Sequence, residues 1–235
     1  MRRDAGLDLV KWLAMLSMLL DHLRYLWPDA YGLFVVGRLA FPLFCLGIAA
    51  NVARTRPGEL FSEGNARYLG WLLVFSLLSE LPYRLLSPES ATFNVMPTLL
   101  LGLMVAWGVH HDERTSLLLA AATVLIATLL HQQLMYGVLG VLLPAAFVQG
   151  LKGLRWWWLP AALAVLANGR NRWFAELGLV ADTLASFAMA CAAALLGLYL
   201  LHRALPLKIW PVGRWGYLFY PGHLLALHVL RSAMP

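Results

Sequence analysis

The chain has 235 residues, of which 61% are hydrophobic and only 13% are charged, and its formal net charge is +6. A soluble domain is about half apolar and about a quarter charged, so this composition excludes an ordinary water-soluble domain and predicts an integral membrane protein. The positive charge does not indicate nucleic-acid binding, because the lysines and arginines are scattered between apolar segments, where they set membrane topology.

The apolar segments predict an all-α fold. Lipid offers no hydrogen-bond partner to unpaired backbone groups, and alternating strand patterns are absent, so the spans must be helices. We expect one polytopic membrane domain over residues 1–235, with eight or nine transmembrane helices around a polar internal cavity. The number depends on whether the seventh stretch, which is short and contains Pro160, spans the membrane. The stretches are about 7–27, 31–53, 67–86, 95–110, 115–131, 134–150, 156–168, 179–201 and 210–231.

The basic residues between these stretches favour a cytoplasmic N-terminus, and we interpret the first stretch as a retained signal anchor. With nine spans, eleven basic residues lie inside and five outside. The inside set is Arg2, Arg3, Arg54, Arg56, Arg67, Arg114, Lys152, Arg155, Arg203, Lys208 and Arg214. The outside set is Arg24, Arg84, Arg170, Arg172 and Arg231.

The first stretch, DLVKWLAMLSMLLDH, carries more ionisable groups than a lipid-facing helix tolerates. Asp8, Lys11 and His22 lie on one stripe of a helix, and Lys11 and His22 are separated by about 16 Å along its axis. This stripe is therefore expected to face protein or water. Two simpler interpretations stay open: Asp8 and Lys11 form a boundary ion pair, and Asp21 and His22 form a helix-end pair.

The second stretch places Arg38 in its middle, with Pro42 one turn later. Proline within a helix predicts a kink and a freed carbonyl. An arginine at this depth needs an anion or a cage of carbonyl groups, so it is either a site residue or a structural partner of Glu80 or Asp21. Asn51 closes the stretch as a helix cap or as a further site residue.

The third and last stretches add further polar groups. Glu80 and Arg84 are one helical turn apart, so they either line a site or satisfy each other. In the last stretch, GRWGYLFYPGHLLALHVLR, Tyr217, Tyr220 and His223 recur every three residues on one face, beside a Pro-Gly pair that opens the backbone. Several stretches thus contribute costly polar groups, which predicts one shared cavity.

A histidine beside a carboxylate can act as a general base near neutral pH, and a nearby Arg or Lys can hold a phosphate or stabilise an oxyanion. The sequence has no GxSxG motif, no metal-ligand spacing and no glycine-rich phosphate loop. These groups fit acyl transfer. They fit a proton-coupled transporter equally well, and composition and spacing leave both open.

Three ordered segments resemble the TraX family, whose founding member N-acetylates the amino terminus of F-type pilin and which includes fimbrial-assembly relatives. They are DLVKWLAMLSMLLDHLRY, VGRLAFPLFCLGIAANVAR and GYLFYPGHLLALHVLR. FNVMPTLLLGLM and YGVLGVLLPAAF also look like the middle spans of that family. The resemblance implies a protein of the bacterial inner membrane.

A more distant resemblance is to the acyltransferase-3 membrane proteins, in which an Arg precedes a catalytic His by ten intervening residues. Here Lys11 stands where that Arg would be, and His22 matches the His. Arg38 with Pro42 looks like their Arg-x-x-x-Pro motif. Lys11 departs from the pattern because it lacks the bidentate fork of Arg.

These resemblances imply an acetyl-CoA-dependent acyltransferase without a metal, in which acetyl-CoA approaches from the cytoplasm. The acceptor they imply is the N-terminal amine of a membrane-resident pilin. A glycan or other small acceptor, or a transporter or scaffold function, are the alternatives. In the implied mechanism the catalytic residues are His22, Asp21 and His223: His22 is the general base, oriented by Asp21 or another carboxylate, and His223 with Tyr220 lines the acceptor side or donates to the oxyanion. The substrate-binding residues would be Lys11, Arg38, Asp8, Asn51, Glu80, Arg84, Tyr217 and Tyr220.

Overall fold

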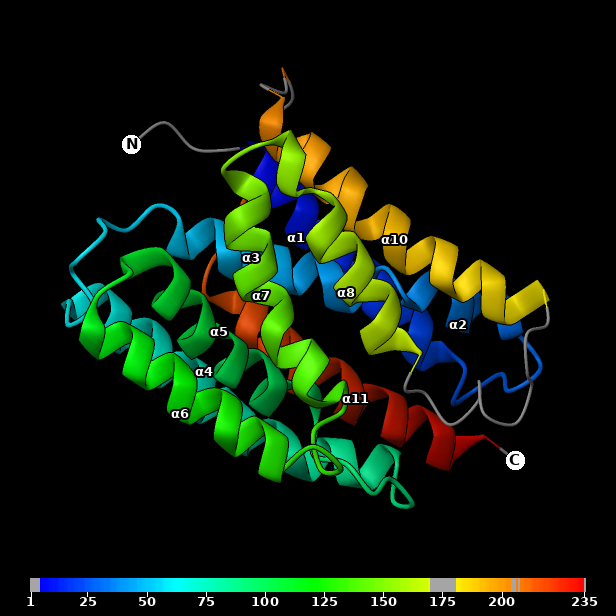
Figure 1. Ribbon diagram of the computed structural model, residues 1–235. Helices are drawn as coiled ribbons and strands as arrows, with labels where there is room; N and C mark the ends of the chain where they lie inside the picture. Colours follow the sequence, from blue (N-terminus) through cyan, green and yellow to red (C-terminus); the bar gives the residue numbers. More distant parts are fainter. Residues whose placement is uncertain (1–4, 170–180, 204–205, 207, 235) are drawn as a thin grey trace.

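The computed structural model describes residues 5–169, 181–203, 206 and 208–234, and all regular elements in these ranges are helices (Figure 1). Each apolar stretch predicted from the sequence contains at least one helix, and the stretch 31–53 contains two. The predicted positions of Arg2, Arg3, Arg170 and Arg172, and the start of the stretch 179–201, fall outside the described residues. The elements are α1 (Ala5–Leu23), α2 (Tyr31–Gly37), α3 (Ala40–Val52), α4 (Glu63–Leu86), α5 (Val95–His111), α6 (Arg114–Leu129), α7 (Gly137–Leu151), the 3₁₀ helix η1 (Leu154–Trp156), α8 (Trp158–Asn168), α10 (Ala181–His202) and α11 (Trp215–Ala233).

Three helical stretches among the described residues are long and apolar enough to cross a membrane: Tyr31–Val52, Glu63–Leu86 and Ala181–His202. The helices Val95–His111, Arg114–Leu129 and Gly137–Leu151 are apolar but shorter. The predicted count of eight or nine spans is therefore larger than the number that helix length and composition support here, and it stays a prediction.

The stretch Tyr31–Val52 is interrupted where the sequence predicts a kink. Helix α2 ends at Gly37 and α3 begins at Ala40, so Arg38 and Leu39 lie at the break. Pro42 is four residues after Arg38, and a proline can neither donate to the carbonyl at i−4 nor pack closely against it. The predicted kink is confirmed, and it frees the backbone at the position from which the Arg38 side chain projects.

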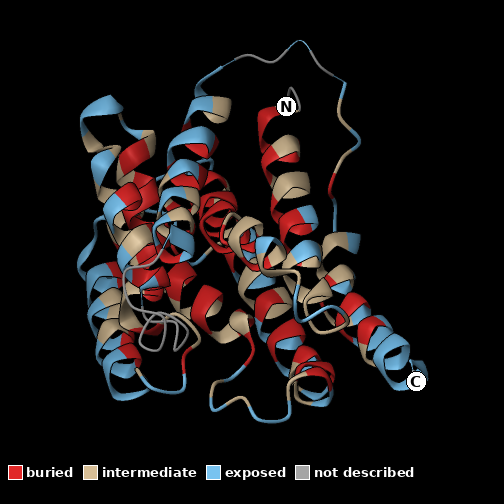
Figure 2. Ribbon diagram, turned by 90° about the vertical axis from the view of Figure 1, so that its right-hand side faces the viewer, coloured by how far each residue is buried: buried red, intermediate tan, exposed pale blue. Residues whose placement is uncertain are grey.

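Helix α3 lies at the centre of the bundle, where it packs against α1, α5, α7 and α10. In the stretch Tyr31–Val52 72% of the most apolar window is buried, against 33% in α4 and 39% in α10. The outer faces of α4 and α6 instead expose leucines such as Leu77, Leu81 and Leu129. Figure 2 shows buried residues on the inward faces of the helices and exposed residues on the outside. The peripheral helices thus present an apolar surface suited to lipid.

Glycines allow the inner helices to approach closely. A Cβ atom at Gly197 of α10 would lie 2.5 Å from a methyl group of Leu46 in α3, so that methyl group would have to move. A Cβ atom at Gly37, at the end of α2, would collide with the side chain of Asp21 in α1. Small residues at such contacts are typical of membrane helix packing, and the second contact sets the distance between α1 and the Arg38 break.

Candidate functional site

Helices α1 and α11 run side by side in the same direction, although they lie at opposite ends of the chain. Two contacts define this arrangement. The Lys11 ammonium lies 3.4 Å from the backbone carbonyl of Val212, and the ring nitrogens Nδ1 of His22 and Nε2 of His223 lie 2.8 Å apart. Both pairs have a sequence separation of 201 residues, so the two segments stay in register over about three helical turns.

The contact between His22 and His223 brings together two predicted catalytic residues from different helices. Their ring centroids are 4.9 Å apart, with an angle of 37° between the planes. The Tyr25 ring stacks at 6.1 Å from His22, and the Phe219 ring stacks at 5.1 Å from His223. The second nitrogen of His223, Nδ1, lies 2.8 Å from the carbonyl oxygen of Phe219. Both imidazoles are therefore held in defined orientations by hydrogen bonds and ring contacts.

Asp21, the residue beside His22 in sequence, has a different partner. One of its oxygens accepts a hydrogen bond of 2.7 Å from Nη2 of Arg38, and Arg24 approaches the other oxygen at 3.9 Å. Arg38 is buried, and its Nε donates to the Phe34 carbonyl at 3.1 Å. Its guanidinium also lies 4.1 Å from the centre of the Phe34 ring, a cation–π contact. The structural pairing of Arg38 with Asp21, one of the sequence-based alternatives, is thus present.

Asp8 and Lys11 hold the backbone of a single residue in the irregular segment before α11. The Asp8 carboxylate accepts the Val212 N–H at 3.1 Å, and Lys11 donates to the Val212 carbonyl at 3.4 Å. The indole of Trp12 donates to the carbonyl of Trp210 at 2.8 Å. Non-helical backbone close to lipid needs polar partners from the protein, and the first turns of α1 supply them. We call these contacts to residues 210 and 212 the α1 clamp.

A cavity lies between these two contacts. It encloses about 840 Å³ of empty space, its open mouth included, and its walls come from α1, α3, α4, α5, α11 and residues 212–213. Its polar lining residues are Lys11, Asn51, Tyr68, Tyr217 and Tyr220. The apolar lining includes Met15, Met18, Phe44, Ile48, Leu72, Val95, Met96 and Leu99.

The cavity changes in character along α1. Lys11 lies beside residues 212–213, and Asn51 and Tyr68, which also line the cavity, are 3.5 Å apart. Two turns after Lys11 the lining residue of α1 is Met18, and one turn after Met18 comes His22. His22, Arg38 and His223 do not line the cavity. The His pair adjoins it through Tyr220, whose ring centroid is 5.7 Å from that of His223.

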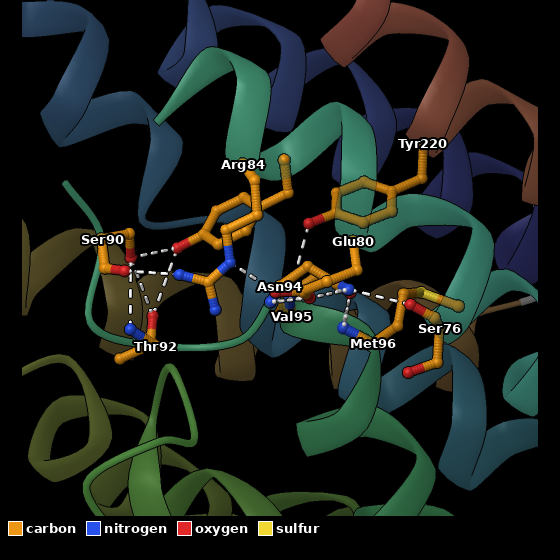
Figure 3. Close-up of polar contacts among 10 residues, drawn as sticks. Ser76, Glu80, Arg84, Ser90, Thr92, Asn94, Val95, Met96 and Tyr220 are labelled. Atoms are coloured by element: carbon orange, nitrogen blue, oxygen red, sulfur yellow. Dashed lines mark hydrogen bonds and ion pairs between the residues drawn. The ribbon is translucent and has the colours of Figure 1, made fainter. Parts of the chain in front are cut away.

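Glu80 and Arg84, two predicted binding residues, satisfy each other at the end of α4 (Figure 3). Arg84 Nε donates to one Glu80 oxygen at 2.7 Å, and Arg84 Nη1 donates to the Ser90 carbonyl at 2.6 Å. The other Glu80 oxygen accepts two hydrogen bonds from Asn94, from its backbone N–H at 3.0 Å and its side-chain amide at 2.7 Å. This geometry fits the simpler alternative, in which the pair has a structural role.

Asn94 was not singled out from the sequence, yet it connects this network to the cavity. Its side-chain oxygen accepts the N–H of Met96 at 2.9 Å and so caps α5, and its amide donates to the Ser76 carbonyl at 2.9 Å. The next residue, Val95, donates its N–H to the Tyr220 hydroxyl at 3.3 Å (Figure 3). Asparagine immediately before an apolar helix is a typical N-cap, and that signal was readable in the segment FNVMPT. Val212 carries no comparable signal.

A family model described as TraX protein matches residues 6–231 of this chain. No curated protein and no solved structure gives a match. The matched region runs from the first turn of α1 to the last turn of α11, and it contains both contacts between these helices, the Arg38 break and every residue that lines the cavity. Because this match covers almost the whole chain, the protein belongs to the TraX family.

Proposed function

We propose that this protein is a membrane-bound acetyltransferase of the bacterial inner membrane, which moves an acetyl group from acetyl-CoA to the N-terminal amine of a pilin subunit. Membership of the TraX family suggests a role in F-pilin processing or conjugation. The observation that carries the chemical part of the proposal is the His22–His223 hydrogen bond beside the cavity between α1 and α11. A histidine held by a second group next to a cavity is suited to general-base catalysis.

The cavity suits a donor with an anionic head and a linear arm. Lys11 would attract the phosphates of acetyl-CoA, with Asn51 and Tyr68 beside the polar part of the arm. The methionines of α1 would then contact the rest of the arm on its way toward Tyr220. Lys11 and His22 are eleven residues apart, about 16 Å along the helix, a separation that an extended pantetheine arm can bridge. Arg38 lies at the opposite end of α1 from Lys11, so the two cations would serve different ends of the reacting molecules.

The reaction replaces the C–S bond of the thioester by a C–N bond and moves one proton from the amine to the thiolate by way of His22. An α-amine has an unperturbed pKa of about 8, so a usable fraction of the acceptor is neutral near pH 7. The neutral amine attacks the thioester carbonyl, the new C–N bond forms, and the C–S bond breaks. His22 takes the proton that the amine loses and returns it to the departing thiolate, so that CoA leaves as a thiol.

Tyr220 is the proposed donor to the oxyanion. Its hydroxyl oxygen accepts the Val95 N–H, so its own proton remains available for donation. The same hydroxyl is tied through Val95 to the Asn94 network at the end of α4, which restrains its position. A donor that is fixed before the reaction costs no reorganisation when charge develops on the carbonyl oxygen.

The first experiment measures transfer from radiolabelled acetyl-CoA to a synthetic peptide with the pilin N-terminus, using purified protein in nanodiscs. We expect His22→Ala to lower kcat by about 10²–10⁴-fold, the usual contribution of a general base. His228→Ala is the histidine control, because His228 lies on α11 outside the His22–His223 pair. Near-normal kcat in His22→Ala, with normal membrane insertion, would remove His22 from the role of base.

The acceptor is tested in the host. Mass spectrometry of pilin from cells with and without the gene should show a difference of one acetyl group at the pilin N-terminus. An unchanged pilin, together with thioester turnover by the purified protein, would favour a glycan or other small acceptor. Absence of turnover with every acceptor tested would favour a transporter or scaffold function.

A further inference from the structure

The hydrogen bonds around His223 have a fixed direction. Its Nδ1 lies 2.8 Å from the Phe219 carbonyl oxygen, and a carbonyl oxygen can only accept. Nδ1 of His223 therefore carries a proton. In a neutral imidazole only one ring nitrogen is protonated, so Nε2 of His223 presents a lone pair.

The direction passes on to His22. Because Nε2 of His223 can only accept, the 2.8 Å contact requires Nδ1 of His22 to be the donor. The proton of a neutral His22 is then on Nδ1, and its Nε2 is left with a lone pair. This is the tautomer that a general base needs if the substrate approaches Nε2.

We propose that His223 is a positioning residue, which holds His22 in the tautomer whose Nε2 is free to accept the proton of the acceptor amine. This inference rests on the proposed acetyl transfer. It assigns to His223 the orienting part that a buried aspartate has in a Ser-His-Asp triad. Both ring nitrogens of His223 are engaged, so His223 has no N–H left to donate to an oxyanion. Of His223 and Tyr220, only Tyr220 can donate this hydrogen bond.

The surroundings explain why a histidine has this role in place of the neighbouring carboxylate. The charged and titratable groups around His22 are Asp21, Arg24, Arg38, His223 and the stacked Tyr25. Asp21 is already engaged by Arg38 at 2.7 Å, so it is not free to orient the imidazole. His223 is 8% exposed and its ring is fixed by its own helix backbone. A neutral partner orients His22 without adding charge to an apolar region.

The test compares three substitutions at His223 by steady-state acetyl transfer in nanodiscs. His223→Gln keeps an acceptor, because the Gln side-chain oxygen reaches about as far as Nε2, so we expect kcat within about tenfold of wild type. His223→Leu has similar bulk but no acceptor, and we expect kcat to fall about 100-fold or more, with a much smaller change in KM for acetyl-CoA.

His223→Glu gives a readout that packing alone would not change. A carboxylate would accept the same N–H and also stabilise the charged imidazole, so the acidic limb of the kcat/KM profile should move to higher pH. His223→Gln, with a neutral acceptor, should leave that limb in place. Equal losses in the Gln and Leu variants, or an unmoved limb in the Glu variant, would overturn the positioning role.

Nitrogen-15 spectra of the histidine rings separate this inference from the proposed function. The His22 signals are assigned by their loss in His22→Ala. In the wild-type protein, His22 should have a protonated Nδ1 and an unprotonated Nε2. His223→Leu should populate both tautomers. The opposite tautomer in wild type would overturn the inference even if acetyl transfer is found. If the wild-type protein transfers no acetyl group, the proposed function fails, while the spectra still decide the tautomer.

Discussion

The two ends of α1 use the same kinds of residue for different purposes. At its beginning, Asp8 and Lys11 both contact the backbone of Val212 and hold an irregular segment against the helix. At its end, Asp21 contacts the Arg38 side chain, and His22 contacts the His223 side chain. The first arrangement satisfies backbone groups, and the second joins side chains that come from different helices. An acid three residues from a lysine, or next to a histidine, therefore does not by itself identify a site.

The largest loss of stability is expected at the end of α1, in the buried Asp21–Arg38 pair. Arg38→Met leaves the Asp21 carboxylate, whose side chain is 13% exposed, without its close partner. Removing one member of such a pair costs about 3–5 kcal/mol of folding free energy. Thermal unfolding in detergent should show this loss, and the double variant Asp21→Asn, Arg38→Met should recover part of it.

The control for that experiment is a solvent-exposed ion pair. Arg56 and Glu59 are 3.5 Å apart, with side chains 85% and 56% exposed, so Arg56→Met should change the stability by no more than about 1 kcal/mol. A loss in Arg38→Met as small as that in Arg56→Met would mean that the Arg38 pair is not effectively buried.

A smaller effect is expected at the α1 clamp. Asp8→Ala removes the acceptor of the Val212 N–H, and both residues are buried, so we expect a loss of about 1–3 kcal/mol. Asp8→Asn keeps an acceptor oxygen and should be milder. Hydrogen exchange at the Val212 amide reports the same contact directly. Unchanged protection in Asp8→Ala would show that the carboxylate does not hold this segment.

The smallest effect is expected at Lys11. It tests whether the beginning of α1 has only a structural role. If Lys11 also attracts the donor phosphates, Lys11→Met should raise KM for acetyl-CoA by about tenfold, equivalent to about 1.4 kcal/mol. The truncated donor acetyl-pantetheine carries no phosphate, so its KM should be unchanged by the same substitution. Equal losses with both donors would restrict Lys11 to its structural role in the clamp.

Much of the fold could be predicted from local sequence. Each apolar stretch contains a helix among the described residues, and the break at Arg38 lies where Pro42 predicts it. The pairing of Glu80 with Arg84 follows from their spacing of one turn. The number of membrane spans was harder to predict from the sequence. Helices α5, α6 and α7 are apolar but short, and the apolar sequence of α1 contains charged residues.

The composition and periodicity of this sequence determined that the protein is helical, apolar on its outside and obliged to satisfy several charges internally, since these are properties of residues close together in the chain. Only the tertiary structure decided which polar groups meet. Close packing at Gly37 brings Asp21 beside Arg38, and the parallel course of α1 and α11 places His22 against His223, 201 residues away. Such contacts depend on how helices pack in three dimensions. No local pattern in the sequence shows which residues far apart in the chain will meet.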